Sequence, residues 1–158
     1  MAETTVVRQQ DEGKALWVLG GLYEVKAAGA ETDGKLTVMQ MTIPAGMGPP
    51  PHTHPGGEAV YVLEGRIRYH IGDDAVEGGP GSFFYIPEGI WENFEPIEDV
   101  RLLVIYAPSG GTDEFFDEVG DPASAREVPP PSDEPPDMAR IMAAAERQGM
   151  RIQAPTEA

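Results

Sequence analysis

The sequence predicts an all-β domain followed by a short helical extension. Nineteen Gly and 16 Pro residues punctuate the short apolar runs of this 158-residue chain. Short apolar runs bounded by turn residues are typical of the strands of a sandwich or barrel. After residue 107 the strand pattern stops and two helical patterns follow. We therefore expect the β domain in residues 1–108 and the extension in residues 109–158.

About eight or nine short strands are expected, with a turn signal after each. The clearest lies at residues 66–71, where apolar side chains alternate with Arg66, Arg68 and His70. Because this polar face is expected to be exposed, His70 is an unlikely metal ligand. The expected strands are residues 15–19, 22–28, 35–43, 58–63, 66–71, 75–77, 82–86, 90–94 and 100–106.

The extension contains two short helical patterns joined by a proline-rich segment. Thr112 is the expected N-cap of the first helix, and acidic residues follow it in the first turn. Residues 128–136 contain five prolines and predict an extended, polyproline-like strap. Asp137 is expected to cap the second helix, whose apolar positions begin at Met138 and repeat with helical spacing until Gly149.

Charge and cysteine content exclude several classes of function. The chain has 27 acidic and 11 basic residues, so its net charge is −16. A chain this acidic is not expected to bind nucleic acid or an anionic membrane. Because there is no Cys, disulfides, thiolate zinc sites, iron–sulfur clusters and a Cys nucleophile are also excluded. With neither a signal peptide nor an apolar run of membrane-spanning length, we expect a cytoplasmic protein.

A possible metal site lies in and just after the Pro- and Gly-rich loop at residues 44–57. The loop holds His52 and His54, two of the three histidines, and Glu58 follows four residues after His54. Positions i and i+2 of an extended segment point the same way, so the two imidazoles are expected to project together. Two imidazoles and one carboxylate form the facial triad of non-haem iron sites. The alternative is a pair of exposed loop histidines beside an unrelated Glu.

The residues around this triad carry a family resemblance. The pattern Gly46-x5-His52-x-His54-x3-Glu58-x6-Gly65 fills residues 46–65 and resembles the first cupin motif. The resemblance implies an antiparallel jelly-roll β-barrel of six to eight strands. It also implies one divalent metal ion per chain, held inside the barrel by the two histidines and the Glu.

Residues 81–96 resemble the second cupin motif in their first half only. Gly81-x5-Pro87-x-Gly89 matches its start, but Glu92 stands where the family has a His and Pro96 where it has an Asn. Glu92 could be a fourth metal ligand, a general base beside the metal, or a sign that the metal has been lost. As a ligand it would make an anionic site that favours Fe, Mn, Ni or Co over Cu(I), with Zn possible.

Alternation along the strands gives an expected pocket wall. Val60 and Val62 share a face with Glu58, while Ile90 and Phe94 share a face with Glu92. Such a wall is suited to a hydrophobic or aromatic ligand. The substrate is therefore expected to be a small organic molecule.

Three functions are open at this point. The first is a metal-dependent oxygenase, most simply of the dioxygenase type, because a facial triad beside an apolar wall leaves coordination positions open for substrate and oxygen. The extension is similar in layout, but not in chemistry, to that of bacterial quercetin-dioxygenase-like monocupins. The second is a non-oxidative cyclase or isomerase that uses the same metal. The third is a non-catalytic small-molecule-binding protein, since fold does not imply function. The resemblance also implies a homodimer.

Overall fold

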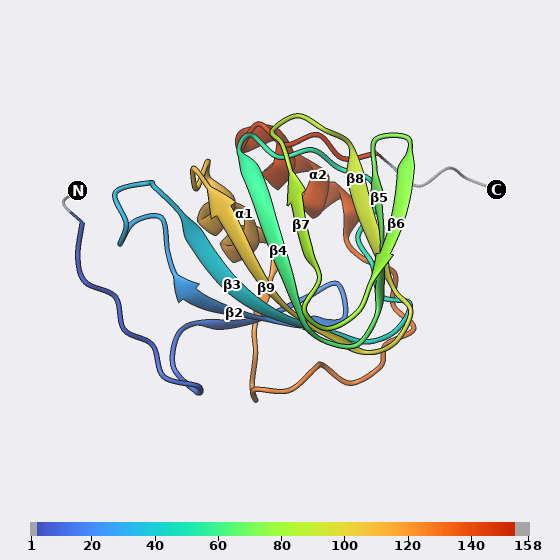
Figure 1. Cartoon of the computed structure of the whole chain (residues 1–158). Coiled ribbons are helices and arrows are strands. Elements are labelled where there is room, and N and C mark those ends of the chain that lie inside the picture. Colours follow the sequence, from blue (N-terminus) through green and yellow to red (C-terminus); the bar gives the residue numbers. More distant parts are fainter. Residues whose placement is uncertain (1–2, 154–158) are drawn as a thin grey trace.

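The computed structural model describes residues 3–153, and it confirms an all-β domain with two short helices (Figure 1). Two antiparallel sheets face each other in the manner of a jelly roll, as expected. The elements are β1 (Ala15–Val18), β2 (Gly21–Ala27), β3 (Thr37–Ile43), β4 (Gly57–Glu64), β5 (Ile67–Ile71), β6 (Asp74–Gly78), β7 (Phe83–Ile86), β8 (Glu92–Pro96), β9 (Val100–Ala107), α1 (Thr112–Val119), β10 (Asp121–Pro122) and α2 (Met138–Arg147).

The larger sheet has the strand order β10-β1-β2-β3-β9-β4-β7, and the smaller has the order β6-β5-β8. The central strands of the larger sheet alternate between buried and half-buried residues, as in the TVMQMTI sequence of β3. This period of two sends every second side chain into the space between the sheets. The buried core residues there include Met39, Met41, Val60, Val62 and Leu102. The hydrophobic core thus fills much of the space inside the barrel, and the candidate functional site lies at one end of it.

Two differences from the expected elements concern short segments. β8 begins at Glu92 instead of residue 90, because Ile90 and Trp91 belong to the turn before it. The two-residue strand β10 was not expected, and it lies along the edge of the larger sheet by pairing with Leu16 and Trp17 of β1. Two residues are too few to show an alternating pattern, so only the tertiary structure identifies this strand.

The C-terminal extension lies behind β9, β4 and β7 in Figure 1 and covers the open end of the barrel. The N-cap of α1 is Gly111 instead of the expected Thr112, which is the first helical residue and donates from Oγ1 to the Ser109 carbonyl. For α2 the expected cap is confirmed, since the Asp137 carboxylate accepts a hydrogen bond from the Arg140 backbone N–H at 3.1 Å.

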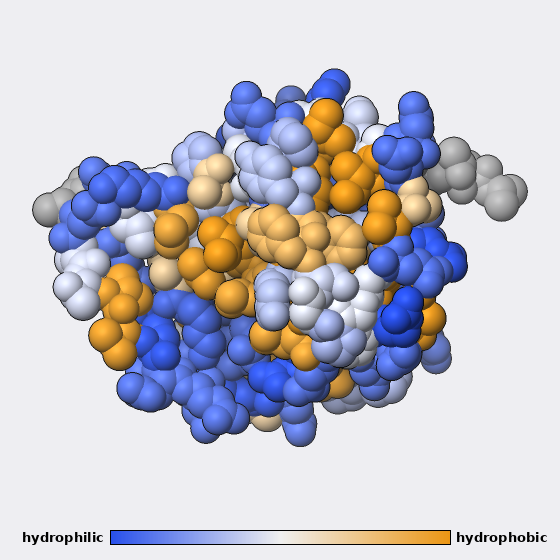
Figure 2. Space-filling model, in the orientation of Figure 1, coloured by the Kyte–Doolittle hydropathy of each residue, from blue (hydrophilic) through white to orange (hydrophobic). Residues whose placement is uncertain are grey.

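The outer face of the barrel carries large apolar side chains. Figure 2 shows apolar residues gathered across the middle of this face, over β4, β7 and β9. The exposed members on β4 and β7 are Tyr61, Leu63, Phe83 and Tyr85. The homodimer stays a prediction. None of the helices among residues 3–153 is long and apolar enough to cross a membrane.

Candidate metal centre

The ligand loop is held to the smaller sheet through its backbone. His52 and Glu92 exchange both backbone hydrogen bonds, each with an N···O distance of 2.9 Å. The Gly89 N–H donates to the His54 carbonyl at 3.0 Å, from a turn in which Gly89 has a φ of +73°. That backbone conformation favours glycine, which gives the glycine of the second motif a structural role. These backbone hydrogen bonds alone fix the loop histidines and Glu92 relative to one another.

Glu58 comes from the opposite sheet. It is the second residue of β4, where it lies between Ile86 of β7 and Tyr106 of β9 in register. Its side chain points inward, as the alternation of β4 predicts. Glu92, the first residue of β8, faces it from the smaller sheet, so the site joins both sheets.

The four predicted side chains converge on one point. All are buried, and one ligand atom from each of His52, His54, Glu58 and Glu92 lies within 4.8 Å of the others. The two Nε2 atoms are 3.0 Å apart, and His54 Nε2 is 2.9 Å from Glu58 Oε2. Glu92 Oε1 lies 3.3 Å from each Nε2 atom. The exposed-loop alternative for the histidines is therefore wrong.

The hydrogen bonds around the cluster leave its inner atoms free. His52 Nδ1 lies 2.8 Å from the Pro50 carbonyl, to which it donates, so the neutral ring presents a lone pair at Nε2. Within residues 3–153, no donor from outside the cluster reaches Glu58 Oε2 or either carboxylate oxygen of Glu92, and all three atoms are buried. Buried carboxylates without donors are costly. The side chains therefore point at a position where a positive charge is missing.

Their protonation equilibria give the same picture. Burial and the charge of Glu92 raise the pKa of Glu58 to about 8. Burial alone would raise the pKa of Glu92 too, but contacts with Glu58 and the two imidazoles hold it well below its usual range. Burial acts to lower the pKa of His54, yet Glu58 and Glu92 outweigh burial and raise it to about 10. Without another cation, protons must supply the positive charge that the two carboxylates require.

The donor set fits a divalent metal ion. Ligands about 2.1 Å from an ion lie about 3.0–3.4 Å apart when they occupy adjacent octahedral or tetrahedral positions. The distances between the two Nε2 atoms, from His54 Nε2 to Glu58 Oε2, and from Glu92 Oε1 to each Nε2 atom are 2.9–3.3 Å. Such an ion would neutralise both carboxylates and leave both imidazoles neutral.

Comparisons with known proteins agree with this architecture. Residues 39–106 match the Cupin_2 family, described as the cupin domain. The match spans the barrel from β3 to β9, so this part of the chain resembles a cupin domain in both sequence and fold. An uncharacterised protein of Streptomyces coelicolor is 29% identical over 97 residues, which cover 55% of this chain and 92% of that protein.

Three solved cupin-like structures illustrate the likeness of fold. An RmlC-like cupin from Shewanella frigidimarina has a TM-score of 0.61 at 14% identity, covering 69% of this chain and 96% of that one. Oxalate decarboxylase from Bacillus subtilis has a TM-score of 0.60 at 19% identity, covering 69% of this chain but only 30% of that one. KdgF from Halomonas sp. has a TM-score of 0.56 at 18% identity, covering 66% and 94%.

A cavity of about 900 Å³ extends from the metal cluster to the C-terminal extension. His52, His54 and Glu58 line it, whereas Glu92, only 2% exposed, does not. The strap, residues 128–136, lines the same cavity together with residues of α1 and α2. The C-terminal extension therefore contributes to the cavity that the metal cluster opens into.

The expected pocket wall is correct at one position of four. Phe94 lines the cavity. Val60 and Val62 point inward as predicted, but they are fully buried in the core instead of lining the cavity. Ile90 is 38% exposed in the turn before β8, where strand alternation does not apply, and it does not line the cavity either.

Three tyrosines near the cluster were not predicted as site residues. Tyr69, fully buried on β5, donates from its hydroxyl to Glu58 Oε1 at 3.3 Å. Tyr106 packs against His54 with ring centroids 5.0 Å apart, and Tyr23 lines the cavity with it. Burial is the main cause that raises the pKa of each phenol, so the hydroxyls stay protonated. Strand alternation, which places these tyrosines on inward-facing positions, is the sequence signal that could have identified them.

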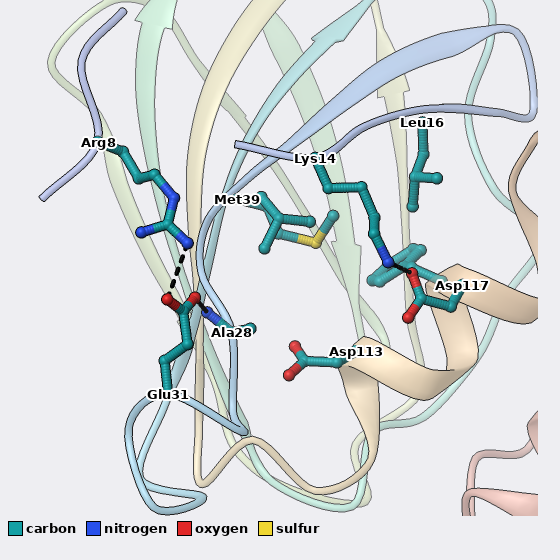
Figure 3. Close-up of a pocket in the computed structure, with 10 residues that line it drawn as sticks. Arg8, Lys14, Leu16, Ala28, Glu31, Met39, Asp113 and Asp117 are labelled. Atoms are coloured by element: carbon teal, nitrogen blue, oxygen red, sulfur yellow. Dashed lines mark hydrogen bonds and ion pairs between the residues drawn. The ribbon is translucent and has the colours of Figure 1, made fainter. Parts of the chain in front are cut away.

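A second cluster of charged residues lines a smaller cavity of about 180 Å³ (Figure 3). Arg8 Nη2 is 2.8 Å from Glu31 Oε2, and Lys14 Nζ is 2.7 Å from Asp117 Oδ1. The Asp113 carboxylate accepts hydrogen bonds from the Gly29 N–H and, at 2.5 Å, from the Thr37 hydroxyl. Each carboxylate of this cluster has its own donor.

Proposed function

We propose that this protein is a metal-dependent enzyme that acts on a small, largely apolar organic molecule, and that its reaction is an oxygenation of the dioxygenase type. One observation carries the proposal. Four buried ligand atoms, from His52, His54, Glu58 and Glu92, converge beside a cavity large enough for a small organic molecule. Buried carboxylates without donors are an unusual cost for a protein of no metal function.

The residues around the cavity have different expected roles. His52, His54, Glu58 and Glu92 would hold the ion. A divalent metal bound there would supply a Lewis acid that polarises a substrate oxygen and, if redox-active, a means of using molecular oxygen. Tyr69 orients Glu58 through its hydrogen bond. Phe94, Phe115 and Phe116 offer apolar surface to the substrate, while the strap limits the access of water.

Of the three roles open to Glu92, the geometry supports that of ligand. Its Oε1 lies 3.3 Å from both Nε2 atoms, which is the spacing of neighbouring ligands. A general base must reach the substrate, but Glu92 does not line the cavity. Two carboxylates and two imidazoles favour Mn, Fe, Ni or Co, with Zn as an alternative. A structural neighbour, the Bacillus subtilis oxalate decarboxylase, has Mn(II) centres.

A second candidate is non-oxidative chemistry, such as cyclisation or isomerisation. The same four-residue cluster supports it, because a divalent ion held there would act as a Lewis acid whether or not it is redox-active. The third possibility, a non-catalytic binding protein, requires that ligand binding does not lead to turnover with any metal.

Elemental mass spectrometry of protein purified without chelator tests the proposal first. We expect near-stoichiometric Fe, Mn, Ni or Co in the wild type, followed by oxygen uptake with catechol or flavonol substrates after reconstitution. Turnover that persists under strict anaerobiosis would favour the non-oxidative candidate. Protein that takes up no metal on reconstitution would overturn both enzymatic proposals and leave the binding protein.

A further inference from the structure

The large cavity contains two buried hydroxyl groups that the metal cluster does not use. Tyr23 is 5% exposed and Tyr106 is 4% exposed, and both side chains line the cavity. Within residues 3–153 neither hydroxyl has a hydrogen-bond partner. Neither hydroxyl oxygen is completely buried, so each can be reached from the cavity. A phenol in a largely apolar cavity ordinarily finds a partner. These two hydroxyls are therefore available to a ligand.

Both phenols are held in place by rigid elements. Tyr106 lies on β9 directly opposite Glu58 of β4, and Tyr23 lies on β2 opposite Met41 of β3. Phe116 packs against both rings, with centroids 5.3 Å from Tyr23 and 6.1 Å from Tyr106. Donors fixed in this way lose little conformational entropy when a ligand binds.

Outside the metal cluster, the side chains of the cavity offer no free cation to an anionic ligand. Arg140 is the one Lys or Arg among the described lining residues. Its guanidinium already contacts the carbonyls of Glu118 and Gly120 and the carboxylate of Asp121. The other charged lining residues, apart from Glu58 of the cluster, are exposed acidic side chains: Asp99, Asp121, Glu134 and Asp137. Away from the cluster, these side chains therefore favour an uncharged ligand over an anionic one.

We propose that Tyr23 and Tyr106 form an oxygen-binding subsite for an uncharged, largely apolar ligand. Each phenol donates one hydrogen bond to a carbonyl or hydroxyl oxygen of the ligand, and the apolar body of the ligand lies against Phe94, Phe115 and Phe116. The inference deepens the proposed function by naming the class of substrate, and it rests on that function only in taking this cavity as the substrate site.

Two probes separate the contributions of oxygen and apolar surface. 2-Acetylnaphthalene has an uncharged carbonyl acceptor, and 2-ethylnaphthalene has nearly the same shape without oxygen. Binding of each is measured by equilibrium dialysis to the full-length, metal-reconstituted protein. We expect 2-acetylnaphthalene to bind more tightly than 2-ethylnaphthalene.

The variants Tyr23→Phe and Tyr106→Phe keep the ring and remove only the hydroxyl. Each is expected to weaken the binding of 2-acetylnaphthalene by about 3- to 10-fold, the effect of one net hydrogen bond, and to leave 2-ethylnaphthalene unchanged. Tyr61→Phe and Tyr85→Phe, on the outer face of the barrel, are matched controls that should change neither. Thermal unfolding of all four variants checks that the fold is retained.

Repeating the dialysis with His52→Ala separates this inference from the proposed function. If the tyrosine-dependent preference persists in that variant, the subsite exists whether or not the protein turns over a substrate. The inference is wrong if both Tyr→Phe variants bind the two naphthalenes as the wild type does, or lose both equally. The absence of binding of either naphthalene to the wild type would also overturn it.

Discussion

The two clusters of charged side chains in this protein have similar members but opposite balances of donors and acceptors. In the cluster of Figure 3, Glu31 and Asp117 each pair with a cation, and Asp113 accepts from Thr37 and Gly29. In the metal cluster, Glu58 has one phenol donor, and within the described part of the chain no donor from outside the cluster reaches either oxygen of Glu92. The carboxylates of the first cluster are all paired with protein donors, whereas those of the second require positive charge from elsewhere.

This difference separates structural charge from functional charge. Paired carboxylates near the surface link segments distant in sequence, as the Asp113–Thr37 bond links α1 to β3, and they stabilise the fold modestly. Carboxylates buried without donors destabilise the fold unless a ligand neutralises them. Proteins retain such strain at functional sites. The balance of donors therefore identifies the metal cluster more sharply than the number of acidic residues does.

The largest expected effect is the loss of metal from the unpaired cluster alone. His52→Ala should reduce metal affinity at least 100-fold, since removing a ligand should cost more than removing an outer partner, which costs about 10- to 100-fold. His70→Ala is the matched control, because His70 lies on β5 with its Nε2 3.6 Å from Glu95 and outside the cluster. Metal-to-protein ratios by mass spectrometry give the result. Equal metal loss in the two variants would contradict the assignment.

Removing one carboxylate should change stability in opposite directions in the two clusters. In metal-depleted protein, Glu58→Gln removes repulsion with Glu92 and should raise the free energy of unfolding by about 1–2 kcal/mol. Asp113→Ala leaves the Gly29 N–H without its acceptor and should lower the free energy of unfolding by about 1–2 kcal/mol.

Urea unfolding with and without added metal measures these changes. Saturating metal at about 100 times its Kd should stabilise the wild type by about 2.7 kcal/mol, and it should stabilise Asp113→Ala equally but Glu58→Gln much less. A lower stability of metal-depleted Glu58→Gln than of the wild type would show that the buried carboxylates are already satisfied in the absence of metal.

Much of the fold and the convergence of the two histidines and Glu58 could be predicted from sequence because both depend on local patterns. Alternation placed Glu58 on the inner face of β4, and motif spacing brought His52 and His54 together. The Glu at position 92 could be assigned to the cluster only through the family resemblance, because Glu92 reaches His52 by a contact between distant segments.

Other parts of the site depend on packing that no local pattern records. The alternation that placed Val60 on the inner face could not tell that the core would fill the space around it. The strap was predicted as extended chain, but its place over the cavity follows from tertiary contacts. The C-terminal residues add to this enclosure, since Thr53 donates to the Arg151 carbonyl beside the ligand loop.

A smaller effect is expected at the one hydrogen bond that Glu58 receives from outside the cluster. Tyr69→Phe removes the donor 3.3 Å from Glu58 Oε1 and should lower metal affinity about 10-fold, because outer partners orient metal ligands. Tyr61→Phe is the control, since Tyr61 is also on the barrel but exposed on its outer face. Competition with a metal-binding dye measures both affinities. Unchanged affinity in Tyr69→Phe would mean that strand geometry alone orients Glu58.

The smallest effect lies within the paired cluster, where two carboxylates should titrate in opposite directions. Arg8 is the main cause that lowers the pKa of Glu31 below its ordinary 4.5, so Glu31 contributes stability above pH 4.5 and loses it as pH falls through its folded pKa. Burial raises the pKa of Asp113 above its ordinary 3.8, so its contribution is complete below pH 3.8 and is lost as pH rises through its folded pKa.

Carboxyl NMR titration from pH 2 to about pH 7 resolves the two groups. Arg8→Gln should return the midpoint of Glu31 toward 4.5 and leave that of Asp113 in place, because Arg8 contributes to the first shift and not to the second. If both midpoints moved together in Arg8→Gln, the cluster would titrate as one coupled network like the metal site. Separate movement would show that hydrogen-bonded pairs keep these charges independent, whereas the metal cluster makes Glu58 and Glu92 interdependent.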